Sequence, residues 1–284
     1  MTALAKSFSG FDLRDAFATD AKRAAHFSQE APGVFADLSK NHWDASIEAQ
    51  LLALAEQAGV PAGVLNGVAG DTHAISDAIM ASPEVRKISF TGSTDVGKTL
   101  MRNAAATMKK ISMELGGNAP YIVFDDADLD AAVAGAMACK FRNAGQVCVC
   151  VNRFYIQDGV YDEFVSRLTT EVKKLNVGNG MDKDVNMGPL INLAGLEKVE
   201  DHVKDALEKG GRLLAGGSRH QLGGNFFQPT VIADANEQMK VASEETFGPL
   251  AACFRFKTEE EVIKRSLKDI IQSSNDCGPV STSS

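Results

Sequence analysis

The chain has 284 residues, of which 44% are hydrophobic and 23% charged, and its formal net charge is -8 at pH 7. These values are typical of a globular protein with one large or two modest domains and a substantial core. The negative charge argues against a nucleic-acid-binding surface, and no apolar run is long enough to span a bilayer.

The five cysteines are odd in number and lack the spacing of a disulfide framework. Free thiols suit a reducing compartment. The first residues also lack a basic segment followed by an apolar core, so a secretory signal is not predicted. We therefore expect a cytoplasmic protein.

Residues 1–47 differ from the remainder of the chain. They contain the only tryptophan, Trp43, and a helix-like pattern formed by Phe11, Leu13, Phe17, His26 and Phe27. We interpret this stretch as a foreign or leader helical segment. The string from Phe27 to Asn41 resembles the N-terminal region of glucose-6-phosphate isomerases. A fused reading frame is our preferred explanation, and an unusual leader helix is the alternative.

Helical and extended patterns alternate from Ser46 to Met113. Apolar spacing predicts a helix from Ile47 to Ala58 that ends at Gly59-Val60-Pro61. A later helix begins near Thr94, with Ser93 or Thr94 as its cap. The other elements predicted here are a helix at 74–81 and strands at 64–68, 85–90 and 110–113. Such alternation indicates an α/β fold with parallel strands.

A second α/β unit is predicted after Gly117. Its acidic run Asp125–Asp128 marks the start of a helix, and Thr258 with Glu261 forms a capping box for the last helix. The tail from Ser273 to Ser284 is rich in Ser, Gly and Pro and is expected to be disordered. The predicted strands are 121–124, 151–157, 212–215, 226–232 and 251–256, and the other helices are 129–141, 160–176 and 193–209.

Two motifs combine a carboxylate and a thiol with glycines. One is the Glu-Leu-Gly-Gly string at Glu114–Gly117, and the other is Asn-Ala-Gly-Gln-Val-Cys-Val-Cys at Asn143–Cys150. Catalysis through a cysteine needs a thiolate and a nearby base that later activates water. Glycines beside both residues let backbone amides approach a reacting carbon.

These motifs resemble those of the NAD(P)-dependent aldehyde dehydrogenases. The string Phe-Thr-Gly-Ser-Thr-Asp-Val-Gly at Phe90–Gly97 resembles that family's cofactor-binding turn. The resemblance is strong from about Gln50 to Val262. It implies a soluble enzyme that uses NAD or NADP on an aldehyde substrate, and intact relatives are expected to be homo-oligomers.

The resemblance also implies a domain organisation within a partial aldehyde dehydrogenase fold of the α/β class. Residues 48–115 would be part of a Rossmann-like cofactor domain, and residues 116–262 an incomplete catalytic domain. Residues 263–284 would be a divergent tail.

Cys148 and Glu114 are the predicted catalytic residues. In the family mechanism the Cys148 thiolate attacks the aldehyde carbon, and the resulting thioester is hydrolysed by water that Glu114 activates. We expect partial burial at the strand end to tune the basicity of Glu114. The alternatives are a small buried hydrophobe at Cys148 and a solvated carboxylate at Glu114.

Two motifs are assigned to the cofactor by resemblance. Gly92 and Ser93 open a helix whose N-terminal amides favour an anion such as a pyrophosphate, although a capped helix start explains them equally simply. Glu245 and Phe247, in the string Glu-Glu-Thr-Phe-Gly-Pro, would contact the nicotinamide ribose and the nicotinamide ring. The alternative is an acidic turn before a buried strand.

Arg142 and Cys150 suggest a subfamily, because Phe141–Cys150 closely resembles succinate-semialdehyde dehydrogenases. There the matching arginine binds the substrate's distant carboxylate, a role that suits a guanidinium. A surface ion pair is the alternative for Arg142. Cys150 would face the same side as Cys148 in an extended segment and form a strained, easily reduced bridge with it, or it would only pack.

The remaining candidates receive no functional role. Cys139, Cys253 and Cys277 are expected to be packing cysteines, and the five histidines lack metal-ligand spacing, so no metal is predicted. A complete aldehyde dehydrogenase is much longer than this chain. The alternative to an active enzyme is therefore an inactive fused or truncated fragment that acts only by binding or association. An isomerase acting through residues 1–47 is disfavoured because that stretch is too short for a sugar-phosphate site.

Overall fold

The structure is a computed structural model that describes residues 28–31, 34–37, 58–59, 64 and 70–275. The chain divides into two compact units. Unit 1 comprises residues 1–89 and 98–112, and unit 2 comprises residues 90–97 and 113–284. The predicted boundary between residues 115 and 116 lies near the change of unit after residue 112, but the predicted cofactor segment is divided, since residues 90–97 belong to unit 2.

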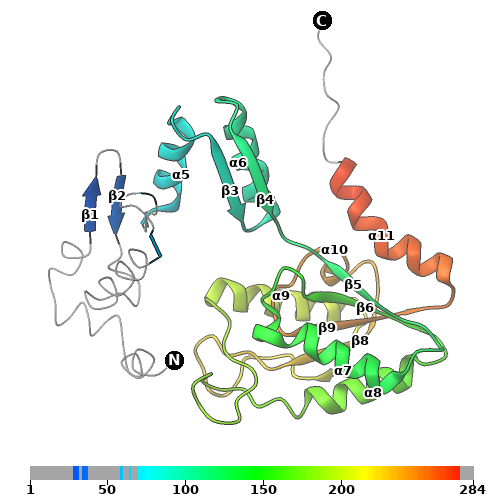
Figure 1. The fold of residues 1–284 in the computed structure, drawn as a ribbon. Helices are drawn as coiled ribbons and strands as arrows, with labels where there is room; N and C mark the ends of the chain where they lie inside the picture. Colours follow the sequence, from blue (N-terminus) through cyan, green and yellow to red (C-terminus); the bar gives the residue numbers. More distant parts are fainter. Residues whose placement is uncertain (1–27, 32–33, 38–57, 60–63, 65–69, 276–284) are drawn as a thin grey trace, which may run out of the picture. The chain divides into compact units, whose positions relative to one another are not determined.

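Unit 1 contains short elements (Figure 1). Strands β1 (Ser28–Ala31) and β2 (Val34–Asp37) form an antiparallel pair. They correct the interpretation of residues 1–47 as wholly helical, since Pro32-Gly33 between the two strands strongly disfavours a continuous helix. Helix α5 (Thr72–Ala81) is capped by the Asp71 side chain, which accepts from the amide of Ala74.

A strand pair and a helix lead into unit 2. Strands β3 (Lys87–Thr91) and β4 (Lys110–Glu114) are hydrogen-bonded neighbours, and helix α6 (Thr94–Ala105) connects them. Of the two caps expected, Ser93 or Thr94, the structure has Ser93, because its hydroxyl accepts from the Val96 amide at 3.4 Å. The site motifs at Gly92 and Glu114 therefore follow or end neighbouring strands.

The core of unit 2 is a five-stranded sheet in the order β5-β6-β9-β8-β7. The β5–β6, β6–β9 and β8–β9 pairs are parallel, as predicted for an α/β fold, whereas β7–β8 is antiparallel. The strands are β5 (Ala119–Val123), β6 (Val151–Gln157), β7 (Arg212–Ala215), β8 (Thr230–Ala235) and β9 (Leu250–Phe256).

Helices cover both faces of this sheet. Figure 1 shows α7 and α8 together over one face and α9 with α10 over the other. Strands β6, β8 and β9 are accordingly buried along nearly their whole length, as central parallel strands are. The helices are α7 (Leu129–Lys140), α8 (Tyr161–Val172), α9 (Leu193–Glu208), α10 (Lys240–Ser243) and α11 (Glu259–Asn275), with a 3₁₀ turn at Arg142–Gly145.

Most predicted elements of residues 70–262 are confirmed, but the start of one strand and the tail beyond residue 262 differ. Strand β8 begins at Thr230 instead of Phe226, because Pro229 has no amide proton to give to a ladder. The tail predicted to be disordered from Ser273 is helical as far as Asn275, so the predicted boundary at residue 263 falls inside α11. The helix predicted at 47–58 and the strand at 64–68 lie almost entirely outside the described residues.

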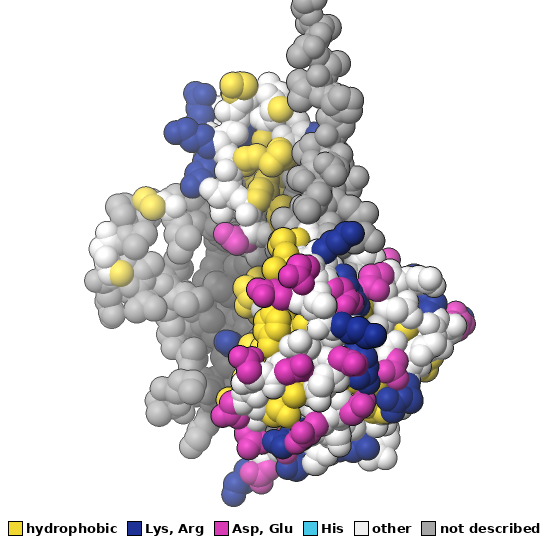
Figure 2. Space-filling model, turned by 90° about the vertical axis from the view of Figure 1, so that its right-hand side faces the viewer, with side chains coloured by type: hydrophobic (Ala, Val, Ile, Leu, Met, Phe, Trp, Pro, Cys, Tyr) yellow, Lys and Arg dark blue, Asp and Glu magenta, His cyan; other side chains and the backbone are white. Residues whose placement is uncertain are grey.

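The surface of the described part carries both signs of charge. Figure 2 shows acidic and basic side chains interspersed over the visible face instead of a continuous basic area. Several charged side chains of the described residues are paired: Arg255 binds both Asp158 and Asp162, and Arg219 binds Glu200. Exposed pairs of this kind contribute little to stability, typically below about 1 kcal/mol each.

Candidate active site

Three separate segments of unit 2 meet at glycines. A Cβ atom on Gly117 would lie 3.1 Å from the carbonyl oxygen of Cys148, and one on Gly116 would lie 2.6 Å from Glu245 Oε2. A Cβ atom on Gly145 would lie only 2.2 Å from the carbonyl oxygen of Gly248. The glycines therefore permit close approach among three segments. These are the Glu-Leu-Gly-Gly turn (residues 114–117), the cysteine loop (residues 142–150) and the Glu-Thr-Phe-Gly segment (residues 245–248).

The cysteine loop has an unusual backbone. Asn143, Ala144 and Gly145 all have positive φ, at 51°, 55° and 73°. The left-handed region suits Gly145 and is tolerated by Asn143, but it costs an alanine about 1–2 kcal/mol. Such strain is held by surrounding contacts and is common at functional sites. Ala144 is fully buried, so packing holds it in this conformation.

Gln146 fastens this loop to a neighbouring segment. Its Nε2 donates to the carbonyl oxygens of Asn143 at 3.0 Å and Pro189 at 3.2 Å, and its Oε1 accepts from the Ile191 amide at 2.8 Å. One side chain thus satisfies three backbone groups. The sequence motif contains Gln146 but does not predict its role as a clamp, because two of its three partners, Pro189 and Ile191, lie more than forty residues away.

Cys148 and Cys150 have opposite environments. Cys148 is exposed and Cys150 is buried. The extended segment expected for them is wrong, since Cys148 and Val149 form a turn in which the Cys150 amide donates to the Val147 carbonyl at 2.9 Å. The Cys150 thiol donates instead to the carbonyl of Val151, and burial raises the pKa of that thiol. A bridge between the two remains a prediction.

Glu114 ends β4 beside the predicted cofactor turn. Its carbonyl oxygen accepts from the Gly92 amide at 3.0 Å. The partial burial expected for its carboxylate is wrong, because Glu114 is exposed where the strand ends. A water molecule can therefore reach the carboxylate.

Glu245 and Phe247 project from the third segment. The Glu245 side chain is half-buried, and its Oε1 atom is buried without a hydrogen-bond partner among the described residues. This burial raises the pKa of the Glu245 carboxyl. Phe247 has a φ of 53° and a side chain that is 39% exposed. An unsatisfied carboxylate oxygen and an exposed aromatic ring in strained backbone favour a ligand at this segment.

Arg142 is exposed at the start of the 3₁₀ turn that leads to Cys148. It forms no ion pair with any residue in the described part of the chain, so the surface-pair explanation receives no support. Gly92 and Ser93 precede α6, and Thr94 Oγ1 would lie 3.8 Å from a Cβ atom on Gly116. The predicted cofactor turn therefore lies beside the Glu-Leu-Gly-Gly turn.

Buried polar residues beneath the site were missed by the sequence interpretation. Lys140 is fully buried and donates to Asn152 Oδ1 at 3.3 Å, and burial lowers the pKa of its amine. Arg153 is also buried and donates to the Asn118 carbonyl at 2.9 Å, just after the glycine pair. No local pattern identified them, since charged residues in an apolar stretch usually lie at the surface.

The described residues contain no group of three or more His, Cys, Asp or Glu side chains placed to hold a metal ion. None of their helices combines the length and apolar character needed to cross a bilayer.

Known proteins resemble this chain over the region that forms the site. The sequence model of the aldehyde dehydrogenase family matches residues 41–266. The 3-sulfolactaldehyde dehydrogenase of Pseudomonas putida is 59% identical over 214 residues, which are 75% of this chain and 44% of that protein. The succinate-semialdehyde dehydrogenase (NADP+) of Escherichia coli is 58% identical over 218 residues, 76% of this chain and 45% of that protein.

A solved structure shares the fold. The crystal structure of an E. coli NADP-dependent enzyme superposes with a TM-score of 0.74 at 57% identity, covering 76% of this chain and 45% of that one. The chain thus spans less than half of the length of the curated relatives and the solved structure that it matches.

Proposed function

The chain belongs to the aldehyde dehydrogenase family, and from this premise we propose that it oxidises a short aldehyde with a terminal anionic group to the carboxylic acid. NAD(P)+ is the proposed cofactor, and the cytoplasm is the proposed location. The observation that carries the proposal is the convergence of an exposed thiol, a carboxylate turn and an unsatisfied glutamate oxygen around Gly116, Gly117 and Gly145.

The described residues fit a nicotinamide cofactor. Glu245 offers a buried oxygen without a protein partner for a ribose hydroxyl, and Gly116 leaves room because a Cβ atom there would clash with Glu245 Oε2. Gly92 and Ser93 would approach the pyrophosphate at the start of α6. Phe247 would lie beside the nicotinamide. When bound, NAD(P)+ would supply the hydride acceptor.

The chain's own residues perform the remaining chemistry. The Cys148 thiolate attacks the carbonyl carbon and forms a C–S bond, and its backbone amide would donate to the developing oxyanion. After hydride loss the acyl group remains on sulfur as a thioester. Glu114 takes a proton from water, the hydroxide adds to the thioester carbon, and the C–S bond breaks to release the acid and regenerate the Cys148 thiolate, after which Glu114 gives its proton to solvent.

Arg142 is proposed to select the substrate. The aldehydes named for two relatives, succinate semialdehyde and 3-sulfolactaldehyde, each carry an anionic group at the end away from the aldehyde. A guanidinium binds carboxylate or sulfonate oxygens with paired N–H donors. Its exposure without an ion-pair partner in the described residues leaves these donors available.

Thiol labelling tests the reactivity of Cys148. Cys139 is equally an exposed free cysteine, whereas Cys253 is buried, and Cys277 lies outside the described residues. Under limiting iodoacetamide we expect Cys148 to be alkylated about ten-fold faster than Cys139, because a thiolate and not mere exposure controls the rate. Peptide mapping with mass spectrometry measures both rates. Equal labelling of the two would contradict an activated nucleophile.

A protein that binds the aldehyde or cofactor without turnover is the second candidate. NADPH formation from succinate semialdehyde separates the two. Preferred labelling of Cys148 with steady NADPH production supports the dehydrogenase. Preferred labelling without turnover supports a competent thiol in a protein that only binds.

A further inference from the structure

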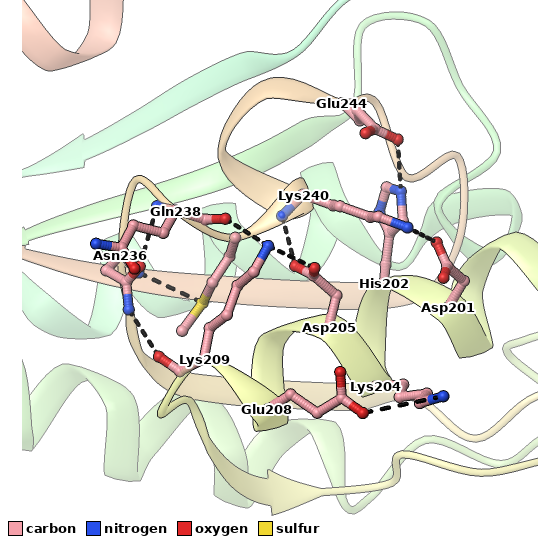
Figure 3. Close-up of polar contacts among 11 residues, drawn as sticks. Asp201, His202, Lys204, Asp205, Glu208, Lys209, Asn236, Gln238, Lys240 and Glu244 are labelled. Carbon is pink, nitrogen blue, oxygen red and sulfur yellow. Dashed lines mark hydrogen bonds and ion pairs between the residues drawn. The ribbon is translucent and has the colours of Figure 1, made fainter.

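A buried histidine connects helix α9 to the Glu-Thr-Phe-Gly segment. His202 is fully buried on α9. Its Nδ1 lies 3.0 Å from Thr246 Oγ1, and its Nε2 lies 3.3 Å from Glu244 Oε2. Figure 3 shows the Glu244 carboxylate turned toward the ring. These two partners are the sequence neighbours of Glu245 on either side.

The chemistry of the partners determines the direction of both hydrogen bonds. A carboxylate only accepts, so Nε2 of the neutral ring carries the proton and donates to Glu244. The deprotonated Nδ1 then accepts from the hydroxyl of Thr246, which is itself 2% exposed. A neutral imidazole therefore satisfies both groups, and a protonated ring has no acceptor to offer Thr246.

A second set of contacts joins α9 to α10 around the ring (Figure 3). Lys240 donates from its amide to Asp205 Oδ2 at 2.7 Å and from Nζ to Asp201 Oδ2 at 2.6 Å. Lys209 donates to the Gln238 carbonyl at 2.6 Å. These contacts fix the start of α10, and the Glu244 amide donates to the Lys240 carbonyl at 2.8 Å, whereas the His202 side chain contacts the side chains of both residues that flank Glu245.

We propose that His202 is a positioning residue for Glu245, holding both of its sequence neighbours so that the Glu245 carboxylate stays against Gly116 and Gly117. This inference rests on the proposed function, since Glu245 is the residue assigned to the cofactor ribose. The Gly117 amide donates to the Glu245 carboxylate, while the Oε1 atom of that carboxylate has no partner among the described residues, so a fixed backbone on both sides of Glu245 helps to keep that oxygen oriented.

Amide exchange tests the positioning without cofactor. In the full chain, His202→Phe keeps an aromatic ring but removes both hydrogen bonds, and we expect about ten-fold faster exchange of the amides of residues 244–248. His202→Asn places a polar atom near Nδ1 and should restore part of the protection. Lys240→Met is the matched control, because it removes the Asp201 contact at the same helix pair but leaves both bonds of His202.

Each outcome decides the proposal. Faster exchange in His202→Phe, partial rescue in His202→Asn and no change at residues 244–248 in Lys240→Met support it. Unchanged exchange in His202→Phe overturns it, and so does an equal increase in Lys240→Met, which would indicate general loosening of α9 against α10.

Cofactor titration adds an independent result. Where the wild-type chain binds NADP+, fluorescence titration with NADPH should show about ten-fold weaker binding for His202→Phe and no change for Lys240→Met. Unchanged affinity of His202→Phe overturns the positioning of Glu245. A wild-type chain that binds no NADP(H) contradicts the proposed function, and the exchange experiment then decides the role of His202 alone.

Discussion

The cysteine loop and the Glu-Thr-Phe-Gly segment both present strained backbone to the same site, but they are held in different ways. Residues 142–150 owe their shape to their own consecutive left-handed residues and to Gln146. Residues 244–248 are held by the buried ring of His202, which hydrogen-bonds Glu244 and Thr246. The cysteine loop is therefore shaped by its own left-handed residues together with a clamp to residues 189 and 191, whereas residues 244–248 depend on a helix about forty residues earlier.

The cysteine loop contacts the Glu-Thr-Phe-Gly segment at Gly145. Replacing Gly145 should therefore lower the free energy of unfolding more than any other change considered below. Gly145→Ala combines a φ of +73° with a Cβ atom only 2.2 Å from the Gly248 carbonyl oxygen. Left-handed strain costs about 1–2 kcal/mol and overpacking about 1–3 kcal/mol, so we expect a loss of about 2–5 kcal/mol in the free energy of unfolding. Urea titration followed by circular dichroism measures this loss.

Gly180→Ala is the matched control for that experiment. No atom lies within 4 Å of a Cβ on Gly180, and its φ is not in the left-handed region. We expect a change within about 0.5 kcal/mol. A Gly145→Ala variant as stable as Gly180→Ala would show that the two loops do not touch as closely as their glycine contact indicates.

The same contrast explains what the sequence could predict. The helix that ends at Lys140, the strand at 151–157 and the exposed thiol between them follow from local patterns and a recognisable motif. Local patterns also predicted the Ser93 cap and the helix begun by Thr258 and Glu261, where the Thr258 hydroxyl accepts from the Glu261 amide.

The remaining features of the site depend on long-range partners. Gln146 binds Pro189 and Ile191, and His202 binds Thr246. Neither role can be predicted from the sequence of a single helix or loop, because these partners lie more than forty residues away. The burial of Glu114 was predicted wrongly because a strand end can face either the core or solvent. Spatial neighbours, not residue type, determine such details.

Removing the charge of Arg142 tests the specificity of the cysteine loop alone. Succinate semialdehyde should protect Cys148 from iodoacetamide, and Arg142→Ala should raise the concentration needed for half protection about ten- to hundred-fold, which corresponds to a lost charge-assisted bond of about 1.5–3 kcal/mol. Protection by the uncharged butanal should stay unchanged. Arg212→Ala, at an exposed arginine paired with Asp234, is the control.

An equal loss of protection for both aldehydes would remove the specificity role of Arg142. This measurement needs no turnover, so it applies also to a chain that only binds. Mass spectrometry of the alkylated peptide gives the rate at each aldehyde concentration.

The pH dependence of stability tests the other loop. Burial lowers the pKa of His202, and Lys198 acts in the same direction, while the facing Glu244 and Asp201 oppose the shift. The unfolded chain then binds the proton more readily than the folded one. The contribution of His202 to stability is present above the ordinary histidine pKa of about 6.5 and is lost as the pH falls toward the lowered value.

We therefore expect the urea midpoint of the wild-type chain to fall more steeply between about pH 6.5 and pH 5 than that of His202→Asn, which cannot titrate. The effect is smaller than that of Gly145→Ala because solvent-exposed Glu244 compensates part of the charge. Parallel curves for the two proteins would contradict a neutral, buried imidazole beneath residues 244–248.

The smallest effect on stability is expected from oxidation of the cysteine loop. We propose that mild peroxide oxidises the exposed Cys148 to a sulfenic acid, whose oxygen leaves as water when the Cys150 thiol attacks the sulfur and forms the S–S bond. Closing a loop this short removes little entropy from the unfolded chain. The Val147–Cys150 turn must open first, because the Cys150 thiol is buried against the Val151 carbonyl.

Peptide mapping should find the bridge in the wild-type chain, formed slowly and reversed by dithiothreitol, and Cys150→Ala should instead accumulate sulfinic acid at Cys148. Sulfinic or sulfonic acid at Cys148 in both proteins would show that the rigid turn keeps the two sulfurs apart. The conformation of the cysteine loop would then position Cys148 as a nucleophile and have no role in a disulfide switch.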